Sequence, residues 1–208
     1  LAECRTATKV LQTTSVGLSL CRKAEDGSTE VAASLIYRRV GKARFGKGSK
    51  GCHVVSLDIQ KCFPSVPFEL VRAAVEYASV EPGSVMYHGI LEIATGAQIQ
   101  LPNGELFTPT RGLATGDCMS CTLLNSICAV AVSAVKKGCP DLKINETADG
   151  NLLVFYADDS QVGADDLADA QRIVDALTKV FVEKWQMSVH ADKSVHMQVN
   201  PVKLTRPT

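Results

Sequence analysis

Two groups of carboxylates could do chemistry in this chain, although 100 residues of sequence lie between them. Asp58 ends a short β-branched run typical of a strand, and Asp158-Asp159 lie between two further strand-like runs. If these strands pair, the carboxylates become neighbours. Mg²⁺ prefers oxygen ligands and is commonly held by one or two carboxylates together with substrate phosphates. Two such ions about 3.5–4 Å apart activate a hydroxyl and stabilise a leaving phosphate oxygen, so the pattern is typical of nucleotidyl transfer.

The surrounding sequence predicts the elements that would position these acids. They are a strand at 53–58, a helix from Pro67 to Ala78, a hairpin of 98–101 and 105–108, a buried helix at 118–135, a hairpin of 152–156 and 160–162, an amphipathic helix at 167–185 and a strand at 195–199. This order predicts an α+β fold, in which helices pack on one face of an antiparallel sheet. Taken alone, Asp-Asp at a hairpin tip is more often an ordinary solvated turn.

One basic segment stands out in a chain with 22 basic and 22 acidic side chains. The segment from Tyr37 to Lys50 contains no acid, and four glycines lie between residues 41 and 51. Its basic residues are Arg38, Arg39, Lys42, Arg44, Lys47 and Lys50. A solvated loop explains the segment, and so does a Gly-rich loop that follows a nucleic-acid backbone. Because the net charge is zero, any contact with nucleic acid must come from such a local patch.

The composition, with 46% hydrophobic residues, is that of a globular protein and excludes collagen-like, disordered and disulfide-scaffold classes. No apolar stretch approaches the roughly 20 residues that cross a bilayer, so we expect no membrane partner and an intracellular location. The eight cysteines are expected to be reduced, and Cys118-x-x-Cys121 lacks the second pair that a zinc site needs. The chain begins at Leu1, which suggests a piece of a longer protein.

Four segments, in order, resemble the motifs of the reverse transcriptase palm. Residues 56–66 place an aromatic five residues after an Asp, and residues 111–125 resemble the family's Gly-x-x-Gln-Gly-Asp-Pro-Leu-Ser-Pro motif with its downstream Asn. Phe-Tyr-Ala-Asp-Asp at 155–159 resembles the Tyr-x-Asp-Asp box, and residues 185–194 resemble the fourth motif with its Lys. The resemblance is closest to retroelements without long terminal repeats, or retrotransposons, and to group II intron enzymes.

This resemblance implies a polymerase palm with a ferredoxin-like core, which transfers nucleotides from a dNTP to a DNA primer on an RNA template. Asp58 and Asp158 would hold two Mg²⁺ ions, or Mn²⁺ in their place, with support from Asp159. Lys193 would donate a proton to the phosphates, and Phe63 would exclude a 2′-hydroxyl. The remaining contacts with nucleotide and template would come from Ile59, Thr115, Gly116, Asp117 and Tyr156.

The resemblance also implies three regions. Residues 1–51 would be an N-terminal segment, a remnant of the fingers with its basic loop at 37–50. Residues 52–199 would be the palm, and residues 200–208 a tail leading to a thumb outside this chain. Further domains or a larger ribonucleoprotein assembly would then complete the polymerase.

Two alternatives follow from the second motif. Thr115 stands where the family has Gln, and Cys118 and Cys121 stand where it has proline, which favours a non-catalytic palm that serves as a structural or RNA-binding part of an assembly. The retained carboxylates favour activity, because mutually repelling acids bring a scaffold no benefit. An RNA-directed RNA polymerase would usually have a second Asp where this chain has Phe63, and its motif Asn would lie closer to Gly116 than Asn125 does.

Overall fold

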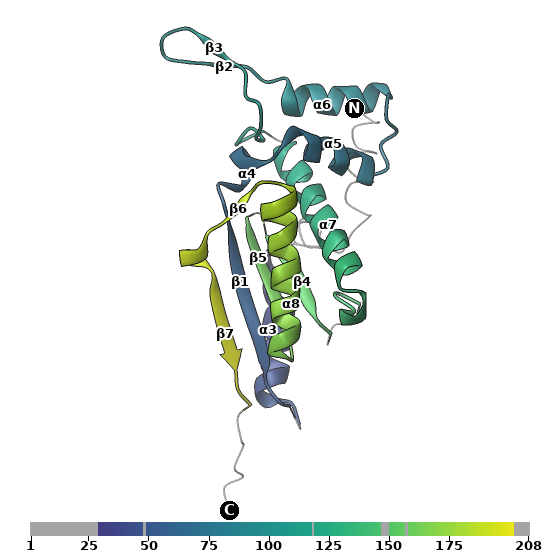
Figure 1. Cartoon of the computed structure of the whole chain (residues 1–208), viewed down its shortest axis with the longest axis vertical. Coiled ribbons are helices and arrows are strands. Elements are labelled where there is room, and N and C mark those ends of the chain that lie inside the picture. Colours follow the sequence, from purple (N-terminus) through teal and green to yellow (C-terminus); the bar gives the residue numbers. More distant parts are fainter. Residues whose placement is uncertain (1–28, 48, 118, 147–149, 157, 202–208) are drawn as a thin grey trace, which may run out of the picture.

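The computed structural model describes residues 29–201 except 48, 118, 147–149 and 157. One antiparallel sheet forms its centre, with strand order β4-β5-β1-β6 and with β7 also paired to β1 (Figure 1). Its strands are β1 (Cys52–Gln60), β4 (Leu152–Tyr156), β5 (Asp159–Ala164), β6 (Ser188–Val189) and β7 (Val195–Val199). β1 is the central strand, since β5 pairs with one of its edges while β6 and β7 share the other.

Helices surround this sheet and connect its strands. They are α3 (Thr29–Phe45), α4 (Cys62–Ser65), α5 (Phe68–Tyr77), α6 (Val85–Thr95), α7 (Ser120–Gly138) and α8 (Leu167–Thr178), with 3-10 turns at Pro140–Leu142 and Ala191–Lys193 and a π-helical turn at Lys179–Lys184. A separate hairpin, β2 (Ile99–Gln100) and β3 (Leu106–Phe107), projects beside α6 in Figure 1. Within the described residues, no helix has both the length and the apolar character that a membrane span requires.

The larger core lies on one face of the sheet. Alternate residues of a strand point to opposite faces, and Leu57 and Ile59 of β1 enter the same core as Phe155 and Val162 from β4 and β5. Helices α5, α7 and α8 supply most of the remaining apolar side chains, and α7 and α8 run along the sheet in Figure 1. The predicted α+β architecture, with helices against an antiparallel sheet, is confirmed.

The opposite face of the sheet is covered along part of its length by α3. Ile36 and Ala43 of α3 pack with Cys52 and Val54 of β1 in a second, smaller core. Among the described residues, the contacts of this second core lie toward the beginning of β1. The fold therefore has a helical layer that the sequence did not predict.

The predicted loop at 37–50 is wrong as far as Phe45, because α3 continues to that residue. Ile36, Val40 and Ala43 recur at helical spacing and turn one stripe of the basic segment toward the sheet. Burial of that stripe outweighs the low helix propensity of Gly41. The segment is thus a basic amphipathic helix and only its last residues form a connection.

Most other predicted elements are confirmed within a few residues, including both hairpins and the strand at 195–199. Helix α6 was not predicted. Its start is marked by Ser84, whose hydroxyl accepts a hydrogen bond of 3.1 Å from the Tyr87 backbone N–H, as an N-cap does. Helix α5 ends at Tyr77, and Ser79 then has a φ of +62°. The Pro82-Gly83 turn lies beyond that end and hides a second helix, which begins at Val85.

Candidate active site

The pairing of β1 with β5 brings the separated carboxylates together. Asp58 lies directly opposite Asp159 in the antiparallel register, and the Ile59 backbone N–H donates a hydrogen bond of 3.1 Å to the Asp158 carbonyl. Strand alternation places Asp58 on the same face as Val54, the face on which α3 packs nearer the beginning of β1. The predicted strand pairing is therefore present, and it gathers acids from two distant parts of the sequence.

The carboxylates lie close enough to influence one another electrostatically. Burial and then the negative charges of Asp158 and Asp58 raise the pKa of Asp159, while Lys193 lowers it by a smaller amount. Burial raises the pKa of the Cys62 thiol to about 12, and the charges of Asp158 and Asp58 contribute to that shift. The region is thus strongly negative, and the Cys62 thiol stays protonated at neutral pH.

Lys193 is held at this site by its own turn. Its Nζ lies 3.5 Å from Asp58 Oδ2, with the Lys193 side chain 63% exposed and that of Asp58 17% exposed. The His190 backbone N–H donates to the Asp58 carbonyl at 2.8 Å, and the Ser194 hydroxyl donates to the His190 carbonyl at 3.0 Å. These bonds fix the turn of residues 191–193 to β1, while the long, exposed lysine side chain remains able to swing.

The donor chemistry of this site fits a hard divalent cation, although the acids do not form a closed cage. Among the described residues no group of three or more His, Cys, Asp or Glu side chains is arranged to hold a metal. Mg²⁺ does not need such a group, because substrate phosphates and water complete its oxygen shell. Burial, followed by the charges of Asp158 and Asp58, raises the pKa of Asp159. The carboxylate oxygens of Asp58 and Asp158 are of the chemical type that such an ion prefers.

Phe63 follows Asp58 by five residues, and its backbone is hydrogen-bonded to the second motif. It belongs to α4, is partly buried, and packs against the main core. Its carbonyl accepts a hydrogen bond of 2.8 Å from the Leu113 N–H, and Gly112 N–H donates to the Val66 carbonyl at 2.7 Å. Gly112 has a φ of +103°, and a Cβ there would come within 2.9 Å of the Pro64 carbonyl oxygen. Only glycine allows this close approach, which sets the second motif against α4.

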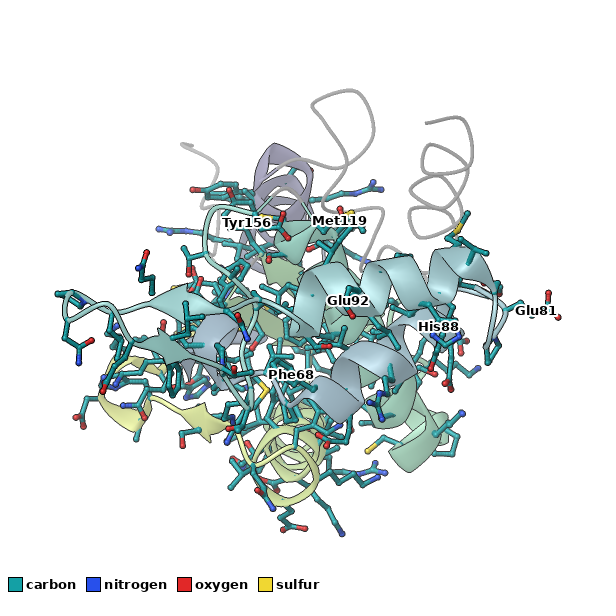
Figure 2. All side chains as sticks on the ribbon, turned by 90° about the horizontal axis from the view of Figure 1, so that it is seen from above. Phe68, Glu81, His88, Glu92, Met119 and Tyr156 are labelled. Carbon is teal, nitrogen blue, oxygen red and sulfur yellow. The ribbon has the colours of Figure 1, made fainter. Side chains whose placement is uncertain are left out.

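The other residues that were predicted to contact the nucleotide lie near this junction, and they differ in how exposed their side chains are. Thr115 and Gly116 are exposed before α7, and the Asp117 carboxylate accepts a weak hydrogen bond of 3.4 Å from the Ser120 hydroxyl. Tyr156, labelled in Figure 2, ends β4 and is 47% exposed. The Ile59 side chain is 2% exposed and lies in the core, so only its backbone can face a nucleotide.

Comparison with known proteins agrees with this geometry. The sequence profile of the family "Reverse transcriptase (RNA-dependent DNA polymerase)" matches residues 4–205. The chain belongs to the reverse transcriptase family. It is therefore a member of a nucleotidyltransferase family, as the four motifs predicted. A comparison with curated proteins finds no match.

Solved telomerase structures share the fold of this reverse transcriptase family member. Apo telomerase from Candida tropicalis, truncated from its C-terminal domain, aligns with a TM-score of 0.71 at 15% identity over 95% of this chain and 39% of its own. Telomerase from Candida albicans, in complex with a TWJ fragment of telomeric RNA, aligns with a TM-score of 0.64 at 15% identity over 91% and 35%. The chain thus spans less than two fifths of the length of these telomerases.

Arg111 is a site residue of this family member that sequence reasoning missed. Its Nε donates to the Ser65 carbonyl at 3.1 Å, Nη2 donates to the same oxygen, and Nη2 also reaches the Gln186 carbonyl at 3.2 Å. One guanidinium therefore joins the α4 segment, the second motif and the segment that leads to Lys193. The signal in the sequence was an arginine directly before Gly112, inside the second motif.

The six basic residues of the segment 37–50 are of two kinds, one buried and the others exposed. Arg39 is 4% exposed, its Nη2 donates to Asp165 Oδ1 at 2.7 Å, and its Nη1 donates to the Gly150 carbonyl. Its prediction as a nucleic-acid contact is corrected, since a buried and paired guanidinium does not reach a phosphate. Gly163 makes room for it, because a Cβ there would lie 2.8 Å from Arg39 Cδ. The other five basic side chains are exposed: Arg38, Lys42, Arg44, Lys47 and Lys50.

Proposed function

We propose that this chain is the polymerase palm of an RNA-directed DNA polymerase, which transfers a nucleotide from a dNTP to the 3′-hydroxyl of a DNA primer on an RNA template. The observation that carries the proposal is the register of Asp58 opposite Asp159, beside Asp158 and with Lys193 Nζ at 3.5 Å. The family match supports it, since the four motifs occur in the family's order.

Asp58 and Asp158 would hold two Mg²⁺ ions, and the same oxygen ligands would accept Mn²⁺. When bound, such ions neutralise charge on the phosphates and make the attacking hydroxyl more acidic. Asp159 would contribute further negative charge from the opposite strand. The protein supplies mainly positioning and electrostatic stabilisation, which account for most of the rate in this kind of displacement.

Lys193 would deliver a proton to the leaving phosphate oxygen. Its ammonium group is held at Asp58 by a single long contact, and its side chain is largely exposed. It can therefore leave the carboxylate when phosphates enter the site. The turn at residues 191–193 stays fixed to β1 and sets how far the ammonium can reach.

Phe63 would lie beneath the sugar of the incoming nucleotide and exclude a 2′-hydroxyl. Its backbone is fixed by the Leu113 hydrogen bond, so the ring has a defined height relative to Thr115 and Gly116. These two residues and Asp117 would face the nucleotide and the template, with Tyr156 on the other side. The altered second motif supplies a hydroxyl at Thr115 where the family has an amide.

An RNA template is the partner that the comparisons favour most. Telomerase from Candida albicans, which has the same fold, was solved with a fragment of telomeric RNA. Because this chain spans only a part of such proteins, we propose that further domains supply grip on the primer and template. The dNTP and the DNA primer follow from the proposed reaction.

Primer extension on an RNA template tests the proposal. The assay compares deoxynucleotides with ribonucleotides in Mg²⁺ or Mn²⁺, for the wild type, Asp158→Asn and the charge-matched control Asp175→Asn on the exposed side of α8. We expect metal-dependent DNA synthesis that falls by about 10²–10³-fold or more in Asp158→Asn and persists in the control. In the same assay Phe63→Val should admit ribonucleotides.

Near-normal synthesis by Asp158→Asn would contradict the assignment. Efficient use of ribonucleotides by the wild type would instead identify an RNA polymerase. No synthesis by folded wild-type protein, alone or with its completing domains, would assign the non-catalytic role in a larger assembly. The altered second motif is the feature that favours that second function, because it changes three of the residues that flank Gly116.

A further inference from the structure

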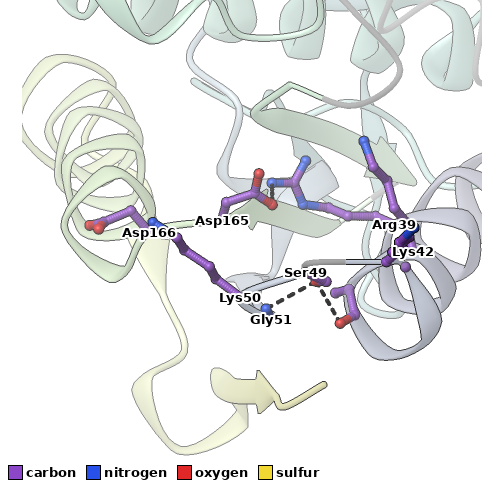
Figure 3. A pocket seen from close by; sticks show the side chains of 10 residues that line it. Arg39, Lys42, Ser49, Lys50, Gly51, Asp165 and Asp166 are labelled. Atoms are coloured by element: carbon purple, nitrogen blue, oxygen red, sulfur yellow. Dashed lines mark hydrogen bonds and ion pairs between the residues drawn. The ribbon is translucent and has the colours of Figure 1, made fainter. Parts of the chain in front are cut away.

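A second site lies at the end of the sheet where β1 begins, away from the carboxylates. It is a pocket of about 520 Å³ between the last turn of α3, the connection to β1 and the residues before α8 (Figure 3). Lys42, Lys47 and Lys50 line it together with Asp165 and Asp166. Because Arg39 also lines it, the pocket collects four of the six basic residues of the segment into one concave surface of an otherwise neutral chain.

The two acids of this pocket are already engaged within the protein. Asp165 accepts the 2.7 Å hydrogen bond from the buried Arg39 guanidinium. Asp166 caps α8, where its Oδ1 accepts a hydrogen bond of 2.7 Å from the Ala168 N–H. With Asp165 balanced by Arg39, Lys47 and Lys50 outnumber the remaining carboxylate. The accessible wall of the pocket is therefore net positive.

The connection that carries these lysines is held in place. The Ser49 hydroxyl donates to the Ala43 carbonyl at 2.7 Å and accepts from the Gly51 N–H at 3.1 Å. Gly51 has a φ of +96°, and any side chain at this position would collide with the Val199 carbonyl. A concave, positively charged wall on a fixed backbone is suited to an anion that carries several oxygens.

We propose that this pocket binds phosphate groups of a nucleic-acid backbone and forms a second contact for the duplex that leaves the active site. The proposal rests on the proposed function. Lysine ammonium groups on phosphates supply affinity without sequence specificity, which a polymerase needs for its product. The same chemistry would also accept free phosphate, so the test includes both.

The central strand sets the distance between the two sites. Gly51 and Asp58 are seven residues apart along β1, which corresponds to about 23 Å at about 3.3 Å per residue. A B-form strand advances about 3.4 Å per nucleotide, so this distance corresponds to about seven nucleotides, and to a few more in an RNA–DNA hybrid of A-like geometry. The inference therefore predicts a minimum duplex length, and not only a general attraction.

The chain offers a matched control for the charge itself. Arg38 and Arg44 lie on α3 with exposed side chains but do not line the pocket. The Arg44 guanidinium lies 5.7 Å from the centre of the Phe45 ring. Arg38→Gln with Arg44→Gln removes two positive charges from α3. Lys47→Gln with Lys50→Gln removes the same number from the connection that follows this helix.

Equilibrium binding of hairpin RNA–DNA duplexes, with stems of about 5 and about 14 base pairs, tests the length prediction. The Lys47→Gln/Lys50→Gln variant should bind the long duplex about tenfold more weakly than the wild type, with a salt slope smaller by about 2. Its affinity for the short duplex should change by less than about twofold, since either contact alone can hold that probe. The arginine variant should lose much less on the long duplex, and circular dichroism checks that both variants fold.

Two results would overturn the inference. One is unchanged binding of the long duplex by the lysine variant, and the other is an equal loss in the arginine variant, which would mean diffuse attraction only. Calorimetry with inorganic phosphate is the second arm: submillimolar binding that the lysine variant loses would assign a small-anion site instead of a backbone contact. Asp158→Asn should retain duplex binding while losing extension, so failure of this site and failure of the proposed catalysis are told apart.

Discussion

The two ends of the central sheet differ in how their charged side chains are paired. Where β1 ends, Asp58 lies opposite Asp159 with Lys193 Nζ at 3.5 Å from Asp58, and burial and then the charges of Asp158 and Asp58 raise the pKa of Asp159. Where β1 begins, the buried Arg39 has a carboxylate at 2.7 Å and a backbone carbonyl as partners. One end keeps its charge available and the other has its buried charge paired.

This difference separates a functional cluster from a structural one. Like charges in proximity disfavour ionisation and so destabilise the fold unless a ligand arrives. A buried guanidinium is instead strongly dependent on its carboxylate partner, and the Arg39 Nε is buried without a hydrogen-bond partner among the described residues. The comparison therefore predicts that substitutions at the two ends shift stability in opposite directions.

The largest effect is expected at the paired end. Asp165→Asn leaves the Arg39 guanidinium buried with its charge uncompensated, so we expect a loss of about 1–2 kcal/mol in the free energy of unfolding, less than for a fully buried pair because the Asp165 side chain is 75% exposed. Arg39→Met should cost less, since the Asp165 side chain that it leaves behind is 75% exposed and stays solvated. Urea denaturation of both variants, with Asp175→Asn as the control, measures the difference. A larger loss in Arg39→Met than in Asp165→Asn would contradict this account of the pair.

The acidic end was predictable from sequence because its information is local. Each motif combines a residue type with a fixed spacing, and the Tyr-x-Asp-Asp box carries both a strand and a turn signal. Pairing of two strand-like runs then brings Asp58 to Asp159 without any knowledge of the remaining fold. The mutual effect on the pKa of Asp159 follows from that pairing.

The basic end was not predictable in the same way, because its arrangement depends on long-range packing. Arg39 belongs to a run of basic residues, and nothing local distinguishes it from Arg38. Its burial depends on Gly163 and Asp165, which are more than 120 residues away. Arg111 was missed for the same reason, since its two acceptors at Ser65 and Gln186 come from distant segments.

An intermediate effect is expected at Lys193, which forms an ion pair with Asp58. Lys193→Met removes the cation that competes for Asp58, so Mn²⁺ should bind the protein about 2–5-fold more tightly in the absence of nucleic acid, as expected for a largely exposed ion pair. Primer extension by the same variant should slow, because the proton donor is lost. Mn²⁺ titration followed by electron paramagnetic resonance measures the affinity.

Lys184→Met is the matched control for this titration, since Lys184 is exposed and lies in the π-helical turn after α8. Its Mn²⁺ affinity should equal that of the wild type. Unchanged or weaker Mn²⁺ binding by Lys193→Met would show that Lys193 does not compete for the metal site. The contrast between tighter metal binding and slower extension distinguishes a catalytic lysine from one that only balances charge.

The smallest effect on stability is expected at Asp159, and its sign is opposite to the effect expected at Asp165. Burial and the charges of Asp158 and Asp58 raise the pKa of this carboxyl, so the folded state holds the proton more tightly than the unfolded chain does. Stability is then lost as the pH rises from the unfolded pKa of about 3.9 through the folded one. Asp159→Asn should therefore raise the melting temperature at pH 7 and leave it unchanged near pH 3, the opposite sign to Asp165→Asn.

Thermal unfolding with and without Mg²⁺ completes this test. If the carboxylates repel one another in the free protein, Mg²⁺ should stabilise the wild type more than Asp159→Asn, and the two melting temperatures should approach each other. A lower melting temperature for Asp159→Asn at pH 7 would mean that this carboxylate already has a stabilising partner. The acidic end would then be a balanced structural cluster like that around Arg39, and its assignment as a metal site would lose its electrostatic basis.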